Sequence, residues 1–326
     1  MTSILFIKTS SLGDVVHHLP VIADLRRQLP AAHVGWVVEE AFAPLVQLHP
    51  GVDEVIPVAW RRWRHALANP AAWREIGTAI RHLRERHYDA VVDTQGLVRT
   101  AAMALLARGH RHGYDRASVR EPLAALAYEK RYAVSRDLHA IARNRALAGA
   151  ALGYRPSDAI DYGLDSTRLA ANTGGHEETV MNAPYAVLLH ATARVEKQWP
   201  EEHWTALGQM LAARGFEVVL PWGSPAERER SERIAAAVPD ARVPEKRPLD
   251  AVARLIAGAA VVVGVDTGLV HVAAALGVPL VAIFRASAPE LTRPLGQGPT
   301  AILGRKGGQV SLGEVEAVVE QVIPAG

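Results

Sequence analysis

Short apolar runs alternate with helical patterns through the first part of the chain. An apolar run at residues 4–8 ends in a turn that contains Gly13, and a helical pattern follows at 15–28. The same order repeats, with strands expected at 33–39, 52–58 and 90–93 and helices at 42–49 and 73–86. This alternation predicts a parallel, doubly wound sheet that is covered by helices on both faces.

A polar, irregular stretch separates this series from a second one. Residues 166–184 show neither helical nor strand periodicity and are expected to link two domains, 1–165 and 185–326. In the second domain we expect strands at 185–189, 217–220, 260–264 and 280–284 and helices at 201–214, 226–237, 249–257, 268–275 and 312–322. The pattern predicts an α/β fold of two doubly wound, Rossmann-like domains, with a ligand in the cleft between them at the carboxyl ends of the strands.

Composition narrows the class of protein. A chain of 326 residues suits two domains of about 150 residues each, and a hydrophobic share of 49% is typical of globular proteins. The absence of cysteine excludes a disulfide framework, a thiolate zinc site and a cysteine nucleophile. The first residues indicate a strand rather than a signal peptide, and no apolar run approaches the roughly 20 residues that span a bilayer. We therefore expect a cytoplasmic protein that is not embedded in a membrane.

Charge is distributed unevenly along the chain. Residues 1–160 carry 21 Lys and Arg against 15 Asp and Glu, a net charge of +6, whereas residues 161–326 carry 15 against 19, a net charge of −4. A basic half joined to an acidic half indicates that the first half meets an anionic partner. The alternative is that the imbalance is only a solvated surface.

The first candidate for chemistry is the turn after the first strand, KTSSLGD at 8–14. It lacks the spacing of a phosphate-binding P-loop and of the Gly-x-Gly-x-x-Gly dinucleotide motif. Asp14 follows Gly13 where a helix is expected to begin, so it could cap that helix by accepting backbone N–H bonds. The alternative is a carboxylate at the mouth of the cleft that acts as a general base.

Two turns in the second domain offer groups that could bind a diphosphate. Arg194 and Lys197 follow the strand at 185–189, where they could pair with phosphates or form an exposed basic loop. The DTG sequence at 266–268 ends a buried strand and begins a helix, whose free N–H groups are suited to phosphate oxygens. His271 lies about one turn into this helix and could reach the same ligand. The alternative is that Asp266 caps the helix and His271 packs in the core.

Further candidates lie in both halves. Glu227 could accept hydrogen bonds from ribose hydroxyls or could simply be an acid at a helix start. Arg61, Arg62 and Arg64 suit carboxylate or phosphate recognition, or a solvated loop, and Arg120 adds to the same basic half. The chain contains no Asp-x-Asp or His-Glu-x-x-His spacing and no basic run interleaved with aromatic residues. We therefore expect neither a bound metal nor a nucleic-acid partner.

Eight short segments carry a resemblance to a known family. They are KTSSLGDV at 8–15, WVVEE at 36–40, RRWR at 61–64, DTQGL at 93–97, HAT at 190–192, KQWPEEHW at 197–204, PWG at 221–223 and DTGLVH at 266–271. Together they closely resemble the lipopolysaccharide heptosyltransferases, and the heptosyltransferase I group in particular. The resemblance runs from the first strand to about residue 280 and keeps the family order of motifs in both domains.

The resemblance implies a metal-independent, inverting glycosyltransferase of the GT-B type, without a cofactor. Such enzymes transfer L-glycero-D-manno-heptose from ADP-heptose to the first Kdo sugar of Kdo2-lipid A in lipopolysaccharide inner-core biosynthesis. It also implies a cytoplasmic location, peripheral to the inner face of the inner membrane. An acceptor that carries carboxylates and phosphates would explain the basic first half.

Residue roles follow from the resemblance by position. Asp14 is then the catalytic base, Lys197 assists catalysis and contacts the diphosphate together with Thr192, and Glu227 contacts the ribose. The remaining positions are Asp266, Thr267, Gly268 and His271 for the donor, and Ser10, Arg61, Arg62, Arg64 and Arg120 for the acceptor.

The chain departs from the family pattern in two places, and other functions stay open. The family often has Thr in place of Ala193, and Gly-Pro-Thr-Asp where this chain has RASAP at 285–289, so that Arg285 could supply a compensating cation. A nucleotide-sugar epimerase and a non-catalytic nucleotide-sugar-binding protein would share the same scaffold. A nicotinamide dehydrogenase is disfavoured, because the Gly-x-Gly-x-x-Gly motif is absent.

Overall fold

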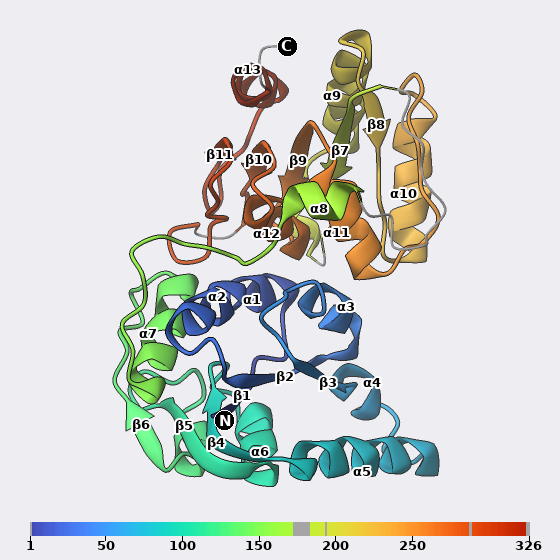
Figure 1. The fold of residues 1–326 in the computed structure, drawn as a ribbon. Helices are drawn as coiled ribbons and strands as arrows, with labels where there is room; N and C mark the ends of the chain where they lie inside the picture. Colours follow the sequence, from blue (N-terminus) through green and yellow to red (C-terminus); the bar gives the residue numbers. More distant parts are fainter. Residues whose placement is uncertain (1, 172–182, 193, 287–288, 324–326) are drawn as a thin grey trace. The chain divides into compact units, whose positions relative to one another are not determined.

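The structure is a computed structural model that describes residues 2–171, 183–192, 194–286 and 289–323. The chain forms two compact units, Met1–Leu164 and Asp165–Gly326 (Figure 1). Each unit contains one parallel sheet with helices, which confirms the α/β fold expected from the sequence. The units are described separately below.

Unit 1 is built on a six-stranded parallel sheet in the order β3-β2-β1-β4-β5-β6. The strands are β1 (Ser3–Ile7), β2 (His33–Glu39), β3 (Glu54–Val58), β4 (His87–Asp93), β5 (Arg108–Tyr114) and β6 (Lys130–Tyr132). Ile4 pairs with Val34 of β2 on one side and with Ala90 of β4 on the other. The strand order therefore reverses between β1 and β4, and doubly wound sheets bind ligands at the carboxyl ends of the strands at such a point.

Seven α-helices of unit 1 surround this sheet: α1 (Leu12–Val16), α2 (Leu19–Gln28), α3 (Ala43–Val46), α4 (Trp60–Trp63), α5 (Pro70–Glu85), α6 (Val98–Leu106) and α7 (Ala140–Leu152). Two 3₁₀ turns, η1 (Glu40–Phe42) and η2 (Pro122–Ala127), complete the described elements. The single helix expected at 15–28 is wrong. It is two helices, because Pro20 lacks an N–H group and its ring prevents the backbone from continuing the turn that ends at Val16.

Unit 2 has a five-stranded parallel sheet in the order β11-β10-β9-β7-β8. Its strands are β7 (Tyr185–Leu189), β8 (Glu217–Val219), β9 (Val261–Val265), β10 (Leu280–Ile283) and β11 (Thr300–Leu303). Its helices are α8 (Ser166–Ala171), α9 (Glu201–Ala213), α10 (Pro225–Ala235), α11 (Leu249–Ala257), α12 (Gly268–Ala275) and α13 (Leu312–Val322), with a 3₁₀ turn η3 (Val195–Lys197). Leu188 pairs with Val263, so β7 and β9 are neighbours and their carboxyl ends meet.

The expected linker at 166–184 is only partly described. Its first residues form the helix α8, which packs against α11, so the expectation of an irregular segment is wrong for 166–171. A short helix without strong amphipathic periodicity gives little signal in the sequence, and its packing against α11 supplies the stabilisation. Residues 172–182 of the expected linker lie outside the described residues.

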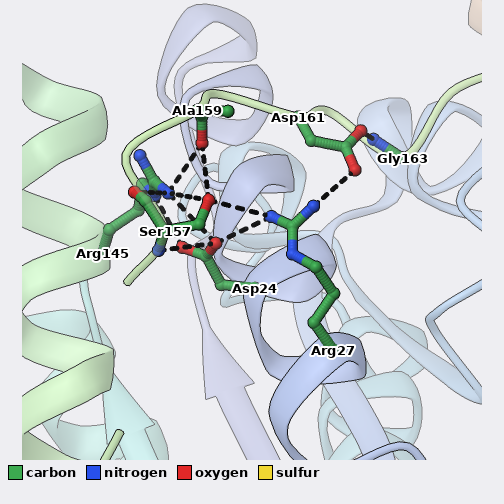
Figure 2. Close-up of polar contacts among 7 residues, drawn as sticks. All are labelled: Asp24, Arg27, Arg145, Ser157, Ala159, Asp161 and Gly163. Carbon is green, nitrogen blue, oxygen red and sulfur yellow. Dashed lines mark hydrogen bonds and ion pairs between the residues drawn. The ribbon is translucent and has the colours of Figure 1, made fainter. Parts of the chain in front are cut away.

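The end of unit 1 is tied back to its helices by a buried ion pair (Figure 2). Arg145 of α7 donates from Nε to Oδ2 of Asp24 at 2.6 Å and from a terminal nitrogen to Oδ1 at 3.0 Å. The same guanidinium donates to the carbonyls of Ser157 and Ala159, at 2.7 and 2.9 Å. Although burial opposes ionisation, the hydrogen bonds from Arg145 and Arg27 hold the pKa of Asp24 below its usual value.

Candidate functional site

In unit 1, the loop after β1 is held by one side chain from the loop after β4. Gln95 accepts hydrogen bonds at Oε1 from the backbone N–H groups of Thr9, at 2.9 Å, and Ser10, at 3.1 Å. Its Nε2 donates to the carbonyl of Ser10. Three backbone groups of the loop are thus fixed by one amide, at the point where the strand order reverses. Nothing in the sequence distinguished Gln95 beyond its place in the DTQGL segment.

Ser10 has a second, charged neighbour. Arg99, in the first turn of α6, donates from a terminal nitrogen to Oγ of Ser10 at 2.8 Å. Ser10 is buried, and Arg99 is half-buried. The expected acceptor residue Ser10 is therefore placed by an arginine that sequence reasoning missed.

Asp14 lies at the third position of α1 and closes a capping box. Its Oδ2 accepts from the backbone N–H of Ser11 at 2.8 Å and from the Ser11 hydroxyl at 3.2 Å. Both bonds end on one carboxylate oxygen of a half-buried side chain. The structure thus contains the capping interaction, and a carboxylate with two oxygens is still able to take a proton from a substrate hydroxyl.

A buried lysine lies behind this loop. Lys8 is 5% exposed and donates from Nζ to the carbonyl of Thr94 at 3.0 Å and to Oδ1 of Asn144 at 3.3 Å. Burial lowers the pKa of Lys8, and the nearby negative charges of Asp14 and Asp93 oppose this shift. The turn that carries Asp14 therefore has a buried amine near it, which the sequence pattern did not reveal.

The next carboxylate, Asp93, is fully buried at the end of β4. It accepts hydrogen bonds from the Tyr128 hydroxyl at 2.7 Å and from the backbone N–H groups of Gln95 and Gly96, at 2.8 and 3.1 Å. Burial raises the pKa of Asp93, while these bonds favour its charged form. Its bonds shape the turn that presents Gln95, so its role is structural.

Arg61, Arg64 and Arg120, three of the arginines expected to bind the acceptor, have different surroundings. The Arg61 guanidinium lies 5.1 Å from the centre of the Phe42 ring, and the Arg61 backbone N–H donates to Glu39 Oε1 at 3.0 Å. Arg64 Nε donates to Nε2 of His65 at 2.9 Å. Arg120 is exposed. Burial has the largest effect on the pKa of Lys8 and lowers it, Asp14 and Asp93 raise it, and the positive charge of Arg120 lowers it further.

The positive charge of Arg62 is paired with carboxylates of the same unit. It forms ion pairs with Glu40 at 3.1 Å and with Glu75 at 2.7 Å. The hydrogen bonds that Arg62 donates to these two carboxylates raise the pKa of Arg62. A ligand anion would compete with both carboxylates for this guanidinium, so Arg61, Arg64 and Arg120 are better placed than Arg62 for the expected acceptor contact.

In unit 2, three of the expected donor residues come together at the carboxyl ends of β7 and β9. Lys197 Nζ lies 2.5 Å from Oδ2 of Asp266, and the side chains are 18% and 15% exposed. The Thr192 hydroxyl donates to the carbonyl of Asp266 at 3.2 Å. Ala193, the expected departure from the family pattern, lies outside the described residues. The Lys197 ammonium, the Thr192 hydroxyl and Asp266 at the end of β9 thus form one polar cluster.

The start of α12 adjoins this cluster. Thr267 is its N-cap and Gly268 its first residue, and among the described residues no N-cap side chain bonds to the helix start. The first N–H groups of such a helix, together with its dipole, favour a phosphate oxygen. His271 is 6% exposed on α12, and this burial favours the interpretation as a packed core histidine.

Glu227 lies at the third position of α10 in a capping box. Its Oε2 accepts from the backbone N–H groups of Gly223, at 2.7 Å, and Ser224, at 3.2 Å. Trp222 donates from Nε1 to the carbonyl of Pro244 at 2.8 Å, and the Arg228 guanidinium lies 5.4 Å from the centre of its ring. The helix-start interpretation of Glu227 is present in the structure, and a ribose contact remains a proposal.

The loop that carries Thr192 and Lys197 is anchored at both ends. Arg230 of α10 donates to the carbonyl of His190 at 3.3 Å and to that of Trp199 at 2.7 Å. Trp199 in turn donates from Nε1 to the carbonyl of Val310 at 2.8 Å. Sequence reasoning missed Arg230, because its partners lie 31 and 40 positions away.

The second departure from the family pattern is partly described. Arg285 is half-buried and donates to the carbonyl of Gln198, so it supports the Lys197 loop rather than standing free as an extra cation. Residues 287–288 lie outside the described residues. Within the described ranges, no three His, Asp or Glu side chains are grouped so as to hold a metal ion, and no helix is long and apolar enough to cross a membrane.

Comparisons with known proteins show the family to which the chain belongs. The sequence model of glycosyltransferase family 9 (heptosyltransferase) matches residues 76–317. Lipopolysaccharide heptosyltransferase 1 of Escherichia coli K12 is 40% identical over 324 residues, 98% of each chain. The enzyme of the same name from Pseudomonas aeruginosa PAO1 is 44% identical over 296 residues, 90% of this chain and 81% of that one. The solved structure of E. coli heptosyltransferase WaaC with ADP superposes with a TM-score of 0.90 at 39% identity, over 98% of this chain and 99% of that one. The chain therefore belongs to glycosyltransferase family 9, the heptosyltransferase family.

Proposed function

We propose that the protein transfers L-glycero-D-manno-heptose from ADP-heptose to the first Kdo sugar of Kdo2-lipid A, with inversion, at the inner face of the inner membrane. The observation that carries the proposal is the cluster of Thr192, Lys197 and Asp266 beside the start of α12. Relatives at 40–44% identity are named lipopolysaccharide heptosyltransferase 1, and a solved structure at 39% identity contains ADP.

Unit 2 is proposed to hold the donor. Lys197 and the N–H groups at the start of α12 would stabilise the negative charge that grows on the diphosphate as the bond from the sugar to its leaving oxygen breaks. Thr192 would add a hydroxyl contact, and Glu227 would accept from the ribose. Because Lys197 is paired with Asp266, the diphosphate has to share or displace that carboxylate.

Unit 1 is proposed to hold the acceptor. Asp14 takes the proton of the acceptor hydroxyl, whose oxygen then bonds to the anomeric carbon of heptose as ADP departs. The buried amine of Lys8 lies near this turn, where burial lowers its pKa and the charge of Asp14 opposes that shift. Ser10, Arg61, Arg64 and Arg120 are the groups available to anionic parts of the acceptor. Inversion follows if the base and the leaving diphosphate act on opposite faces of the sugar.

The deciding experiment measures ADP release with purified protein, ADP-heptose and Kdo2-lipid A, each supplied alone and together. Release of ADP, with heptose appearing on the acceptor, is expected only when both substrates are present. An epimerase would change the sugar of ADP-heptose without acceptor and without releasing ADP. A binding protein would bind the donor without turnover, and either result would overturn the proposal.

A further inference from the structure

A largely apolar cavity of about 310 Å³ lies within unit 1, and of the residues assigned to the reaction only Arg64 is among its lining. It is lined by residues of α4, α5 and α6, by Arg64 and Leu67 between α4 and α5, and by Val58 of β3. Figure 1 shows where these elements lie in unit 1. Its volume is at the lower end of the roughly 300–1,000 Å³ typical of ligand sites. Part of the wall, including Trp63, Leu83 and Met103, belongs to the buried core of the unit.

The cavity opens where apolar side chains are exposed to solvent. Trp60 is 37% exposed and Leu67 is 53% exposed, and both line the cavity. The indole N–H of Trp63 donates to Glu75 Oε2 at 2.9 Å, so it is already hydrogen-bonded within the protein. A sugar or nucleotide placed here would bury hydroxyl and amide groups without partners, which is unfavourable. An aliphatic chain carries no such groups and matches this lining.

Two arginines are the charged members of the lining, Arg64 and Arg99. Arg64 is exposed, and the Arg99 Nε is buried without a hydrogen-bond partner among the described residues. A buried donor that lacks a partner is costly, so an anionic group placed beside it would be favoured. Because Arg99 also bonds to Ser10, it connects the cavity to the loop that precedes Asp14.

We propose that this cavity binds one acyl chain of an anionic lipid, with the anionic group of that lipid beside Arg64 and Arg99. The apolar lining selects the chain, and the two guanidiniums select the negative charge at its end. The inference rests on the proposed function only for the identity of the lipid, which would be the acylated acceptor. Bound in this way, the acyl chain holds the polar end of the acceptor near Ser10.

The first test uses alkyl phosphates below their micelle-forming concentrations, with binding followed by tryptophan fluorescence and calorimetry. Octyl, decyl and dodecyl phosphate should bind with rising affinity, up to about fourfold for each added methylene. Inorganic phosphate should show no measurable binding. Equal affinity across the series, or binding that begins only when micelles form, would overturn the proposal.

A matched pair of variants on α6 locates the binding. Ala102 is exposed and lines the cavity, so Ala102→Phe should obstruct the cavity and lower the affinity for dodecyl phosphate at least tenfold. Leu105 is 55% exposed on the same helix and lies outside the lining, so Leu105→Phe should bind like the wild type. Thermal unfolding verifies that both variants fold. Equal binding by Ala102→Phe and wild type would show adsorption elsewhere and refute the site.

A transfer assay separates this inference from the proposed reaction. Ala102→Phe should raise the KM for Kdo2-lipid A severalfold and leave the KM for its fully deacylated form unchanged. If neither acceptor is used by any of the proteins, the proposed function fails, while the alkyl phosphate series still decides the cavity. An equal rise in KM for both acceptors would contradict the acyl-chain site.

Discussion

Lys197 and Asp266 form an ion pair of 2.5 Å in which both side chains are mostly buried. The cation proposed to bind the diphosphate is therefore positioned before the donor arrives. The carboxylate also keeps an unpaired positive charge from being buried while the site is empty. The pair makes the proposed donor site sensitive to changes at either residue.

Replacing Lys197 by alanine should weaken ADP binding. A lost charge-assisted contact is worth about 1.5–3 kcal/mol, which corresponds to roughly a 10- to 150-fold rise in the dissociation constant. Arg194→Ala is the matched control, because Arg194 belongs to the same loop and its side chain is 66% exposed. Calorimetric titration with ADP measures both variants. A similar loss in both would show a general charge effect rather than a specific contact.

Replacing Asp14 by asparagine should separate capping from catalysis. Asparagine can still accept the Ser11 N–H bond and begin α1, but it cannot take a proton. Turnover should fall by about 10²–10⁴-fold, with ADP affinity and melting temperature retained. Ser11→Ala removes the hydroxyl bond of the capping box and keeps the carboxylate. If Ser11→Ala loses as much turnover as Asp14→Asn, Asp14 acts only as a cap.

We expect transfer to proceed without a divalent metal. Lys197 and the start of α12 would supply the positive charge that a metal would otherwise place on the diphosphate. The ADP-release assay is run after treatment with EDTA and again with added Mg²⁺ or Mn²⁺. Unchanged rates are expected. Loss of activity with chelator, restored by either ion, would falsify this prediction.

Arg230 is predicted to position the Lys197 loop without touching substrate. Lysine cannot span both backbone carbonyls, so Arg230→Lys should raise the KM for ADP-heptose more than it lowers kcat. Arg233→Ala serves as the control, because Arg233 is 57% exposed on the same helix. A fall in kcat with an unchanged KM would argue against positioning of the donor loop.

The ion pair of Asp24 and Arg145 should make stability depend on pH. The pKa of Asp24 is lower in the folded protein than its usual value of about 3.9. Its stabilising contribution is therefore complete above that usual value and is lost as the pH falls through the lower folded pKa. Asp24→Asn should lower the free energy of unfolding by about 3–5 kcal/mol at pH 7, because Arg145 is left buried without its charge partner. The difference from wild type should shrink in acid.

Urea unfolding at neutral and acidic pH tests this dependence. Asp161→Asn is the comparison, since Asp161 pairs with Arg27 at the surface and its side chain is 47% exposed. Surface pairs contribute about 0–1 kcal/mol, so this variant should unfold nearly like the wild type. A constant gap between Asp24→Asn and wild type at every pH would rule out the proposed titration.

The sequence predicted β1 to β4 and β7 to β10 and missed β5, β6 and β11. β1 and β9 are fully buried apolar runs, and both were expected. β5 reads RGHRHGY, with no apolar run, and becomes a strand because it pairs with β4 and β6. β11 is half-buried at the sheet edge. At β5, tertiary pairing outweighs local composition, whereas β11 was missed because its apolar run is only three residues long.

The candidate site was predictable where a motif carried it. Thr192, Lys197 and Asp266 were named from the segments that follow two strands, and the structure brings them together. Gln95 and Arg99 could not be found in this way, because their bonds to the loop after β1 join positions more than 80 residues apart. The pairing of Arg62 with two acids was equally hidden, since Glu40 and Glu75 lie far from it in sequence.

The amide of Gln95 orders the loop after β1 before any ligand is present. The conformational entropy of that loop is therefore lost during folding and not again during binding. A change that loosened the amide is therefore expected to weaken the proposed acceptor binding without removing a single contact to the acceptor. The proposed acceptor affinity of unit 1 therefore depends partly on how firmly the folded protein orders this loop.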